Sequence, residues 1–356
     1  MIDLSCVFRV IPFSGKRNRG AGLISSVFFP SGSVHFRRAF PFDRPTSEVR
    51  KMDLLITHYY HSGFSVEMDD LLFVFDYWRG EHHELQGSAQ ILPEKLKQYR
   101  EVFVFITHEH IDHMDPIVFT WKDAARVSYI VSSDMPVGTR GKRMAPGDSL
   151  ELLPDISVTA FDSTDLGVSF LLNLKGVRVF HAGDLNFWHW RDESTLREID
   201  EAEREFQKAV RPLCREKIDV AFFPVDPRQG SMFEAGANYF ILSVKPRLLI
   251  PMHYFHRSDI ILEYARTASC RSTEVLAMPG LGDSIALSFG EDGYMNISFP
   301  KNQAEQENER MEEALEEIAG DSPFAESDLP LSQLAENRAS ADGVSPDPEG
   351  GETLSP

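Results

Sequence analysis

The segment THEHIDHMDP, residues 107–116, follows directly on the apolar run VFVFI. Such a run is typical of a strand buried on both faces, and the polar residues after it lie where the chain leaves the sheet. Three histidines, His108, His110 and His113, fall within six positions together with Asp112, although the whole chain of 356 residues has only 12 histidines. The segment therefore predicts a metal site at the edge of a sheet.

The residue types indicate which metals such a site would bind. Imidazole nitrogen combined with carboxylate oxygen suits zinc, manganese or iron, and one closed tetrahedral site does not need this many ligands from one segment. His108 and His110 could bind one ion while Asp112 and His113 bind a second. We therefore expect two divalent metal ions as cofactors, with zinc first and manganese or iron as alternatives.

Two later apolar runs end on further residues that can bind metal: VRVFHAGD ends on Asp184, and RLLIPMH ends on His253. Taken alone, an aspartate there is usually a turn residue and a histidine is usually a hydrogen-bonded core group. Together with the first cluster they complete two sets of ligands. We expect Asp184 to bridge the two ions, and Asp112 and His253 to take part in catalysis as well as in metal binding.

The rest of the pattern predicts an α/β domain over residues 52–300. The runs LLITHYY, FSVEM and LLFVFD are short and separated by turn residues, which predicts an antiparallel meander. Helical periodicity follows in PEKLKQY, STLREIDEAEREFQKAVRPL, EAGANYFILS and SDIILEYARTA, and Thr195 with Glu198 predicts a capping box. Strands in meanders that then alternate with helices predict two packed sheets covered by helices.

Charge is uneven along the chain, which has a net charge of -19. Residues 1–51 carry nine Lys and Arg against three Asp and Glu, whereas residues 301–356 carry three against fifteen. We expect the first segment to be a mobile basic extension or an upstream misassigned start, with Met52 as a natural first residue. The second is expected to be an acidic disordered tail, because it has too little apolar surface to offset the entropy of ordering.

Composition also narrows location and partners. The three cysteines are far apart and form no CxxC, which argues against a disulfide framework and favours a reducing cytoplasm. No apolar run is long enough for a membrane span and no signal-peptide order is seen, so we expect a cytoplasmic protein without a membrane partner. The acidic balance argues against nucleic acid. The oligomeric state is left open.

At this point the chain resembles the metallo-β-lactamase-fold hydrolases. The resemblance rests on HxHxDH at residues 108–113, Gly183-Asp184, the PMH ending at His253 and the FDYW at Asp76, and it covers about residues 52–300. The details are most similar to the lactonase-like branch, which includes ascorbate 6-phosphate lactonase. The resemblance implies a four-layer αββα sandwich with a metal pair at one edge, and an acidic residue, here Asp76, that supports the site from nearby.

One element departs from that family. Its members place a further histidine at the end of the strand that corresponds to ISVTAF, and this chain has Asp162-Ser163-Thr164-Asp165 there. Asp162 could coordinate through oxygen instead, which would favour manganese or iron. Alternatively, water fills the position and one ion binds weakly.

Two cations close together lower the pKa of a bound water towards about 7 and polarise a carbonyl or phosphoryl oxygen. The sequence therefore predicts a hydrolase that uses a metal-bound hydroxide on a small ester, lactone or phosphoester. It contains no GxSxG, GxxxxGK[ST] or GxGxxG, which disfavours a serine nucleophile or a nucleotide cofactor. A noncatalytic or mononuclear metal-binding protein is the alternative, and a nuclease of the same fold is less favoured.

Four residues are candidates for binding a small-molecule substrate: His61 in HSGF, Trp188 in LNFWHW, Arg228 in VDPRQG and Tyr254 in HYFH. Each also has a structural interpretation. His61 could be a turn or core histidine, Trp188 a packing residue, and Arg228 the partner of a nearby aspartate. Tyr254 could donate a hydrogen bond to a leaving group or an oxyanion.

Overall fold

The structure, a computed structural model, describes residues 52–80, 90–290 and 293–300. The predicted basic extension over 1–51 and the predicted acidic tail over 301–356 lie outside the described residues. Within the described part, the strands form two sheets of eight and seven strands.

The first sheet has the order β15-β14-β1-β2-β3-β4-β5-β6. Its strands β1, β2 and β3 pair antiparallel, which confirms the predicted meander, and β3, β4, β5 and β6 run parallel. Their bounds are β1 Met52–Tyr60, β2 Gly63–Met68, β3 Leu71–Phe75, β4 Glu101–Ile106, β5 Val127–Ser132, β6 Lys142–Met144, β14 Ser284–Phe289 and β15 Met295–Ser298.

The second sheet has the order β13-β12-β11-β10-β9-β8-β7. It repeats the plan of the first, because β7 to β10 pair antiparallel and β10 to β13 pair parallel. Its bounds are β7 Ser149–Leu153, β8 Ile156–Phe161, β9 Ser169–Leu174, β10 Val177–His181, β11 Val220–Pro224, β12 Leu248–Met252 and β13 Glu274–Val275. The sequence did not predict β6, β7 or β13, which are short or only partly buried.

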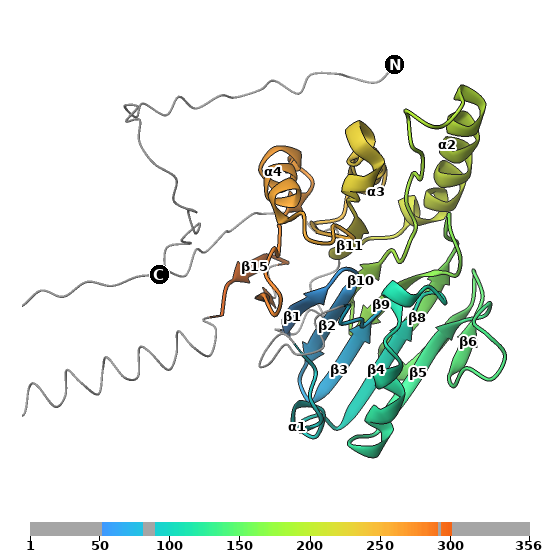
Figure 1. Cartoon of the computed structure of the whole chain (residues 1–356). Helices are drawn as coiled ribbons and strands as arrows, with labels where there is room; N and C mark the ends of the chain where they lie inside the picture. The colour runs from blue at the N-terminus through green and yellow to red at the C-terminus, as the bar shows by residue number, and fades with distance from the viewer. Residues whose placement is uncertain (1–51, 81–89, 291–292, 301–356) are drawn as a thin grey trace, which may run out of the picture. The chain divides into compact units, whose positions relative to one another are not determined.

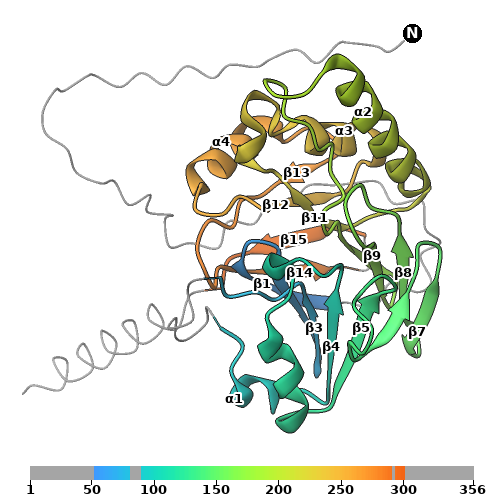
Figure 2. The same ribbon diagram turned by 45° about the vertical axis from the view of Figure 1, so that its right-hand side comes forward.

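Helices cover the outer face of each sheet. The helices α2, α3 and α4 lie on the second sheet, while α1 and the 3-10 helix at Pro116–Asp123 lie on the first (Figures 1 and 2). The α-helices are α1 Pro93–Leu96, α2 Leu196–Val210, α3 Ala235–Val244 and α4 Ser258–Ala268, and the remaining 3-10 helices are Ile111–His113, Arg211–Arg215 and Pro227–Met232. The expected helix in PEKLKQY is thus a single turn, whereas the capping box of Thr195 and Glu198 at the start of α2 is confirmed.

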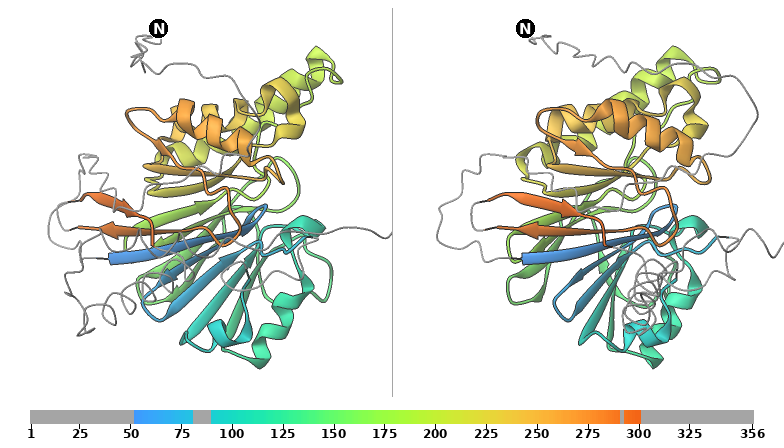
Figure 3. Two further views of the ribbon diagram at one scale, coloured as in Figure 1. Left: turned by 60° about the vertical axis from the view of Figure 1, so that its left-hand side comes forward. Right: turned by 90° about the vertical axis from the view of Figure 1, so that its left-hand side faces the viewer.

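The core explains why these strands stack. Side chains alternate across a strand, and in β11 the ring of Phe222 stacks on Phe64 of β2 at 4.2 Å, whereas the next ring, Phe223, faces Phe240 of α3 at 4.5 Å. All six residues of β4 are buried, as the apolar run predicts. The two inner faces therefore form one core and the two outer faces pack under helices. Figure 3 shows these layers edge-on, which confirms the predicted four-layer αββα sandwich.

The mixed sheets bring the ends of their parallel strands to one edge. In open α/β sheets, ligands bind beyond the carboxyl ends of parallel strands. Here β3 and β4 of one sheet, and β10, β11 and β12 of the other, end there and are followed by polar residues. No helix among the described residues is long and apolar enough to cross a bilayer.

Candidate metal centre

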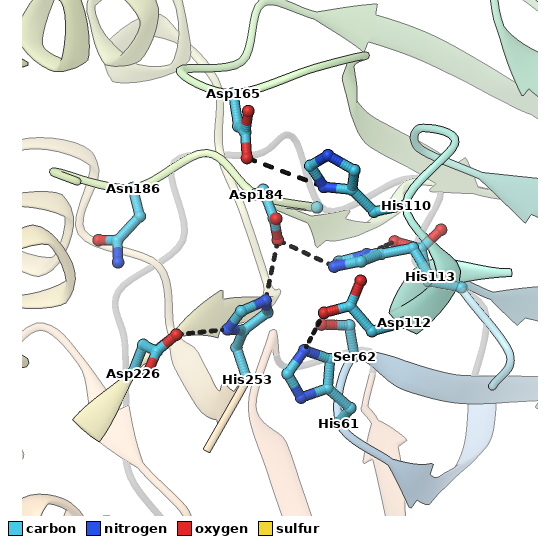
Figure 4. A network of polar contacts seen from close by, with 12 residues as sticks. His61, Ser62, His110, Asp112, His113, Asp165, Asp184, Asn186, Asp226 and His253 are labelled. Atoms are coloured by element: carbon cyan, nitrogen blue, oxygen red, sulfur yellow. Dashed lines mark hydrogen bonds and ion pairs between the residues drawn. The ribbon is translucent and has the colours of Figure 1, made fainter. Parts of the chain in front are cut away.

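The predicted metal residues, with the exception of Asp162, come together from both sheets, and Figure 4 labels all of these except His108. His108, His110, Asp112 and His113 follow β4, while the other two residues follow β10 and β12 of the second sheet, Asp184 and His253. Three sets of potential ligand atoms result, and within each set the atoms lie within 4.8 Å of one another.

The first set, called here the inner group, consists of His61, Asp112, His113 and His253. The three imidazoles are buried, and the Asp112 side chain is 23% exposed. The Nε2 atom of His61 lies 3.3 Å from Oδ2 of Asp112, and the rings of His61 and His253 lie 3.9 Å apart. The structure thus places His61, expected to contact substrate, among the potential ligands.

The second set, called here the outer group, consists of His110, Asp165 and Asp184. The Nδ1 atom of His110 lies 3.9 Å from Oδ2 of Asp165, and these two side chains are 43% and 41% exposed. His108 adjoins this group, because its Nε2 atom lies 3.0 Å from Nδ1 of His110. The side chains of the outer group are therefore more exposed to solvent than those of the inner group.

Asp184 lies between the two groups. Its Oδ1 atom is 3.0 Å from Nε2 of His113 and 3.2 Å from Nε2 of His253. Its Oδ2 atom is 3.5 Å from Nε2 of His108, in the third set of His108, His113 and Asp184. Because the two oxygens face different histidines, this carboxylate has the placement of a bridging ligand.

Asp76, which follows β3, orients two of the histidines. It is fully buried, and its Oδ2 atom accepts from Nδ1 of His113 at 2.7 Å and from Oγ1 of Thr107 at 2.6 Å. The hydroxyl of Thr107, having donated its proton, accepts in turn from Nδ1 of His108 at 3.0 Å. Both imidazoles therefore carry their proton on Nδ1, so each Nε2 keeps a lone pair that can bind metal.

Asp226, which follows β11, does the same for His253. Its Oδ2 atom accepts from Nδ1 of His253 at 2.9 Å and also from the guanidinium of Arg228 at 2.5 Å. Carboxylate–histidine–metal arrangements of this kind fix the tautomer and the ring orientation. Arg228 therefore pairs with an aspartate, as its structural interpretation expected, while its side chain is 52% exposed beside the site.

The hydrogen-bond pattern tests whether these residues suit a metal. Buried polar atoms in proteins are nearly always hydrogen-bonded. Here Nε2 of His113, Nε2 of His253 and Oδ1 of Asp184 are buried and have no aligned hydrogen-bond partner in the described part of the chain, and the same is true of both nitrogens of His61. The unpartnered atoms are nitrogen and oxygen donors facing a common space, so the residues fit one or more divalent ions.

The charges of the site are strongly coupled. Burial alone would raise the pKa of Asp184, but the neighbouring imidazoles of His113 and His253 outweigh it and hold the pKa well below its usual range. Burial would likewise lower the pKa of His113, but Asp184 and Asp76 raise it well above the ordinary value. His61 differs, because burial and the nearby His253 lower its pKa to about 3 and keep it neutral.

Strained backbone occurs here as well as elsewhere, since four of the eight non-glycine residues with positive φ among the described residues belong to this region. Positive φ angles, which cost a non-glycine residue about 1–3 kcal/mol, occur at His61 (53°), Asp76 (41°), His253 (67°) and Phe255 (51°). All four lie at or beside the site. Such strain persists only where the surrounding structure holds the residue in place, so these side chains are held in position by the packing around them.

Two expectations need correction. Asp162 is exposed, its Oδ1 atom accepts from the backbone N–H of Ser163, and it is in none of the ligand sets. Asp165 reaches the site instead, because the loop turns back after Thr164, whose hydroxyl donates to the carbonyl of Asn186 at 2.6 Å. Asp165, rather than Asp162, is therefore the candidate to replace the histidine that the family resemblance led us to expect in this loop.

The second correction concerns Tyr254. It is buried, and its hydroxyl donates to the carbonyl of Met278 at 2.8 Å, in the core rather than at the site. The backbone at His253 and Phe255 has positive φ, which turns successive side chains away from the regular strand direction. Trp188, in contrast, does lie at the site, with its ring 5.5 Å from that of His253 and its indole nitrogen donating to the carbonyl of Asp184 at 2.7 Å.

Sequence reasoning missed three supporting residues. Thr107 and Asp226 each follow a strand end, which was a usable signal, and Asp226 was considered only as the partner of Arg228. His181 ends β10: its Nε2 atom donates to the carbonyl of Ser62 at 2.8 Å, and its Nδ1 atom accepts from the N–H of Gly183 at 3.1 Å. Only the fold brings those two loops together, so no sequence signal could have identified its role.

Comparison with known proteins gives distant matches. No family model matches the chain. Among solved structures it is similar to Igni18, a metallo hydrolase from Ignicoccus hospitalis, with a TM-score of 0.49, 19% identity, and coverage of 67% of this chain and 100% of that one.

Among curated proteins, the chain is similar to UPF0173 metal-dependent hydrolases of archaea. It is 25% identical over 213 residues to one from Pyrobaculum neutrophilum, covering 54% of this chain and 81% of the relative. It is 26% identical over 199 residues to another from Archaeoglobus fulgidus, covering 48% of this chain and 78% of the relative.

Proposed function

We propose that this protein is a metal-dependent hydrolase that binds two divalent ions and acts on a small ester, lactone or phosphoester, as members of the lactonase-like branch would. One observation carries the proposal. Buried nitrogen and oxygen atoms without hydrogen-bond partners face one another across Asp184, and the histidines among them are oriented by carboxylates. The names of the curated relatives, metal-dependent hydrolases, agree with it.

The two ions would be held by different residues. Asp112, His113 and His253 would hold one, and His108, His110 and Asp165 the other, with Asp184 between them. Divalent ions at these positions would lower the pKa of a bound water and polarise a carbonyl or phosphoryl oxygen. Zinc fits the imidazoles, whereas the extra carboxylate of Asp165 also suits manganese or iron.

The residues around the ions suggest how substrate is held. Asp112 is partly exposed and can accept a hydrogen bond from a reacting water, while the buried His253 is kept in place by Asp226. Trp188 provides an apolar wall, and Arg228, stacked 4.7 Å over the ring of Phe255, presents a cation that could pair with an anionic substrate group. A small-molecule substrate remains our proposal, and we expect no nucleic acid partner.

The proposal is tested by metal analysis and turnover on the full chain. Elemental analysis should find two ions per chain, and a panel of lactones, carboxyl esters and phosphodiesters should contain a substrate. Asp184→Asn should lower both metal content and turnover, whereas Asp192→Asn, an exposed aspartate farther along the same segment, should change neither.

A metal-free chain, or a metal-loaded chain without turnover on any of the three bond types, would contradict the proposal. The second result would favour the noncatalytic metal-binding alternative. One ion per chain with turnover would support the mononuclear form.

A further inference from the structure

His61 has features that its place in a tight turn does not explain. It lies between β1 and β2 with φ of 53°, its side chain is fully buried, and neither ring nitrogen has a hydrogen-bond partner among residues 52–80, 90–290 and 293–300. A buried imidazole without partners is costly in free energy. Glycine and asparagine tolerate positive φ better than histidine does, so the turn geometry alone gives no reason for a histidine here.

The ring is held between an apolar wall and the inner group. Phe255 lies 4.3 Å and Trp78 lies 5.8 Å from it, centroid to centroid. On the other side Nε2 lies 3.3 Å from Oδ2 of Asp112, and Figure 4 shows the ring turned towards that carboxylate. This approach is not aligned as a hydrogen bond, because Nε2 counts among the unpartnered atoms.

The turn is fixed against the second sheet by two hydrogen bonds. The backbone N–H of His253 donates to the carbonyl of His61 at 3.2 Å, and Nε2 of His181 donates to the carbonyl of Ser62 at 2.8 Å. The position of His61 is therefore set by the same strand ends that present Asp184 and His253. Ligands held on a rigid scaffold in this way bind without a cost of reorganisation.

We propose that His61 is a further ligand of the inner ion, which makes the two metal positions unequal. This inference rests on the proposed function. With His61, the inner group supplies three imidazoles and Asp112, and Asp184 adds a fifth side chain. Closed sites are typical of structural ions, whereas catalytic ions keep an open position. The inner ion is then retained, and substrate meets the ion of the outer group, where His110 and Asp165 are exposed.

The test compares His61→Ala with His58→Ala. His58 is a matched control, because it is a buried histidine of the adjoining strand with an unpartnered Nε2 and belongs to no ligand set. Full-length protein is loaded with Co²⁺ or Zn²⁺ and then titrated with a competing chelator. Wild type should release its two ions at separate chelator concentrations. Loss of a ligand should weaken the tighter ion by at least the roughly 10- to 100-fold that outer-sphere substitutions cost.

The visible spectrum of bound Co²⁺ gives a second readout that loss of packing alone does not change. It should shift in His61→Ala, and added imidazole, which can fill the vacated space, should restore it. His58→Ala should keep the wild-type spectrum. If His61→Ala does not fold, His61→Asn replaces it in the same experiment, with the spectral shift expected and without the imidazole step.

The outcomes separate the two proposals. A wild-type chain that binds no ion overturns the proposed function, and this inference with it. A wild-type chain that binds two ions, alongside a His61 variant with unchanged affinity and an unchanged Co²⁺ spectrum, overturns the role of His61 alone. Equal release of both ions from wild type overturns the inequality of the two positions.

Discussion

The inner and outer groups meet at Asp184, which belongs to the outer group and contacts His113 and His253 of the inner group, but they differ in how their side chains are held. Of the inner residues, His113 and His253 each donate to a buried carboxylate, and the loop bearing His61 is fixed through backbone carbonyls. In the outer group, His110 and Asp165 are more than two-fifths exposed. The two groups therefore differ in their supporting hydrogen bonds as much as in their ligand types, and under our proposal this difference would separate a position that retains an ion from one that exchanges it.

The loop between β8 and β9 carries Asp165 and is called here the outer loop. It is anchored through its backbone. The N–H of Val168 donates to the carbonyl of Thr107 at 3.1 Å, and the N–H of Gly167 donates to Oδ2 of Asp134 at 2.7 Å. Among the described residues, the carboxylate of Asp165 has no comparable support beyond its approach to His110. The loop thus places an exposed carboxylate beside His110, and under our proposal this is where substrate would enter.

The largest effect should come from removing the carboxylate that supports the buried side. Asp76→Ala leaves the N–H of Thr107, its hydroxyl and Nδ1 of His113 without their acceptor in the core. Breaking a buried charged pair in this way costs about 3–5 kcal/mol. We expect that loss in the free energy of unfolding, measured by denaturant titration, and weaker binding of both ions.

Thr107→Val serves as the graded companion, because it removes only the link from Asp76 to His108. It should weaken the ion next to His108 and leave the inner ion bound. A Thr107→Val chain that loses the inner ion first would reverse our comparison.

The second effect concerns a buried histidine that supports no ion. Burial lowers the pKa of His58 from 6.5 to about 4, so it is neutral in the folded chain. Below pH 6.5 the unfolded chain takes up a proton that the folded chain excludes, so stability falls as the pH drops towards about 4. The full shift corresponds to about 3 kcal/mol at the acid end.

Denaturant titrations in chelator should show this slope in wild type and a flatter one in His58→Gln, with little difference at neutral pH. If the substitution leaves the slope unchanged, the acid sensitivity belongs to the inner group, whose imidazoles are then not protected by their carboxylates.

The third effect tests the outer loop through its glycine. Gly167 has φ of +78°, and a Cβ there would lie 1.9 Å from the carbonyl oxygen of Thr107. Gly147 is the matched control, because its φ is +93° and nothing lies within 4 Å of the same position. Gly167→Ala should lower the free energy of unfolding by about 1–3 kcal/mol more than Gly147→Ala does, because only its Cβ forces the backbone to shift. It should also displace Asp165 and release the outer ion at a lower chelator concentration than wild type does. Equal effects of the two variants would mean that the loop is not tightly docked.

Much of this arrangement could be predicted from the sequence, and the exceptions share a cause. His108 to His113, Asp184 and His253 each follow an apolar run, so the strand pattern alone indicates that they lie at one edge. Asp165 could not be chosen over Asp162, because both lie in one loop and only the hydrogen bond of Thr164 to the segment after β10 decides which one turns inward. The prediction that Tyr254 contacts substrate was wrong for a similar reason, since the backbone torsions at His253 and Phe255 direct its side chain to the core.

The smallest effect on stability, and the sharpest test of the outer group, comes from comparing the two aspartates of that loop. Both are exposed, so Asp165→Ala and Asp162→Ala should each change the free energy of unfolding by no more than about 0.5 kcal/mol. Only Asp165 is grouped with His110 and Asp184. Elemental analysis should therefore find one ion fewer in Asp165→Ala, with turnover lost and the inner ion kept, while Asp162→Ala matches wild type. If instead Asp162→Ala loses the ion, the loop has a different conformation when metal is bound, and our assignment of the outer group is wrong.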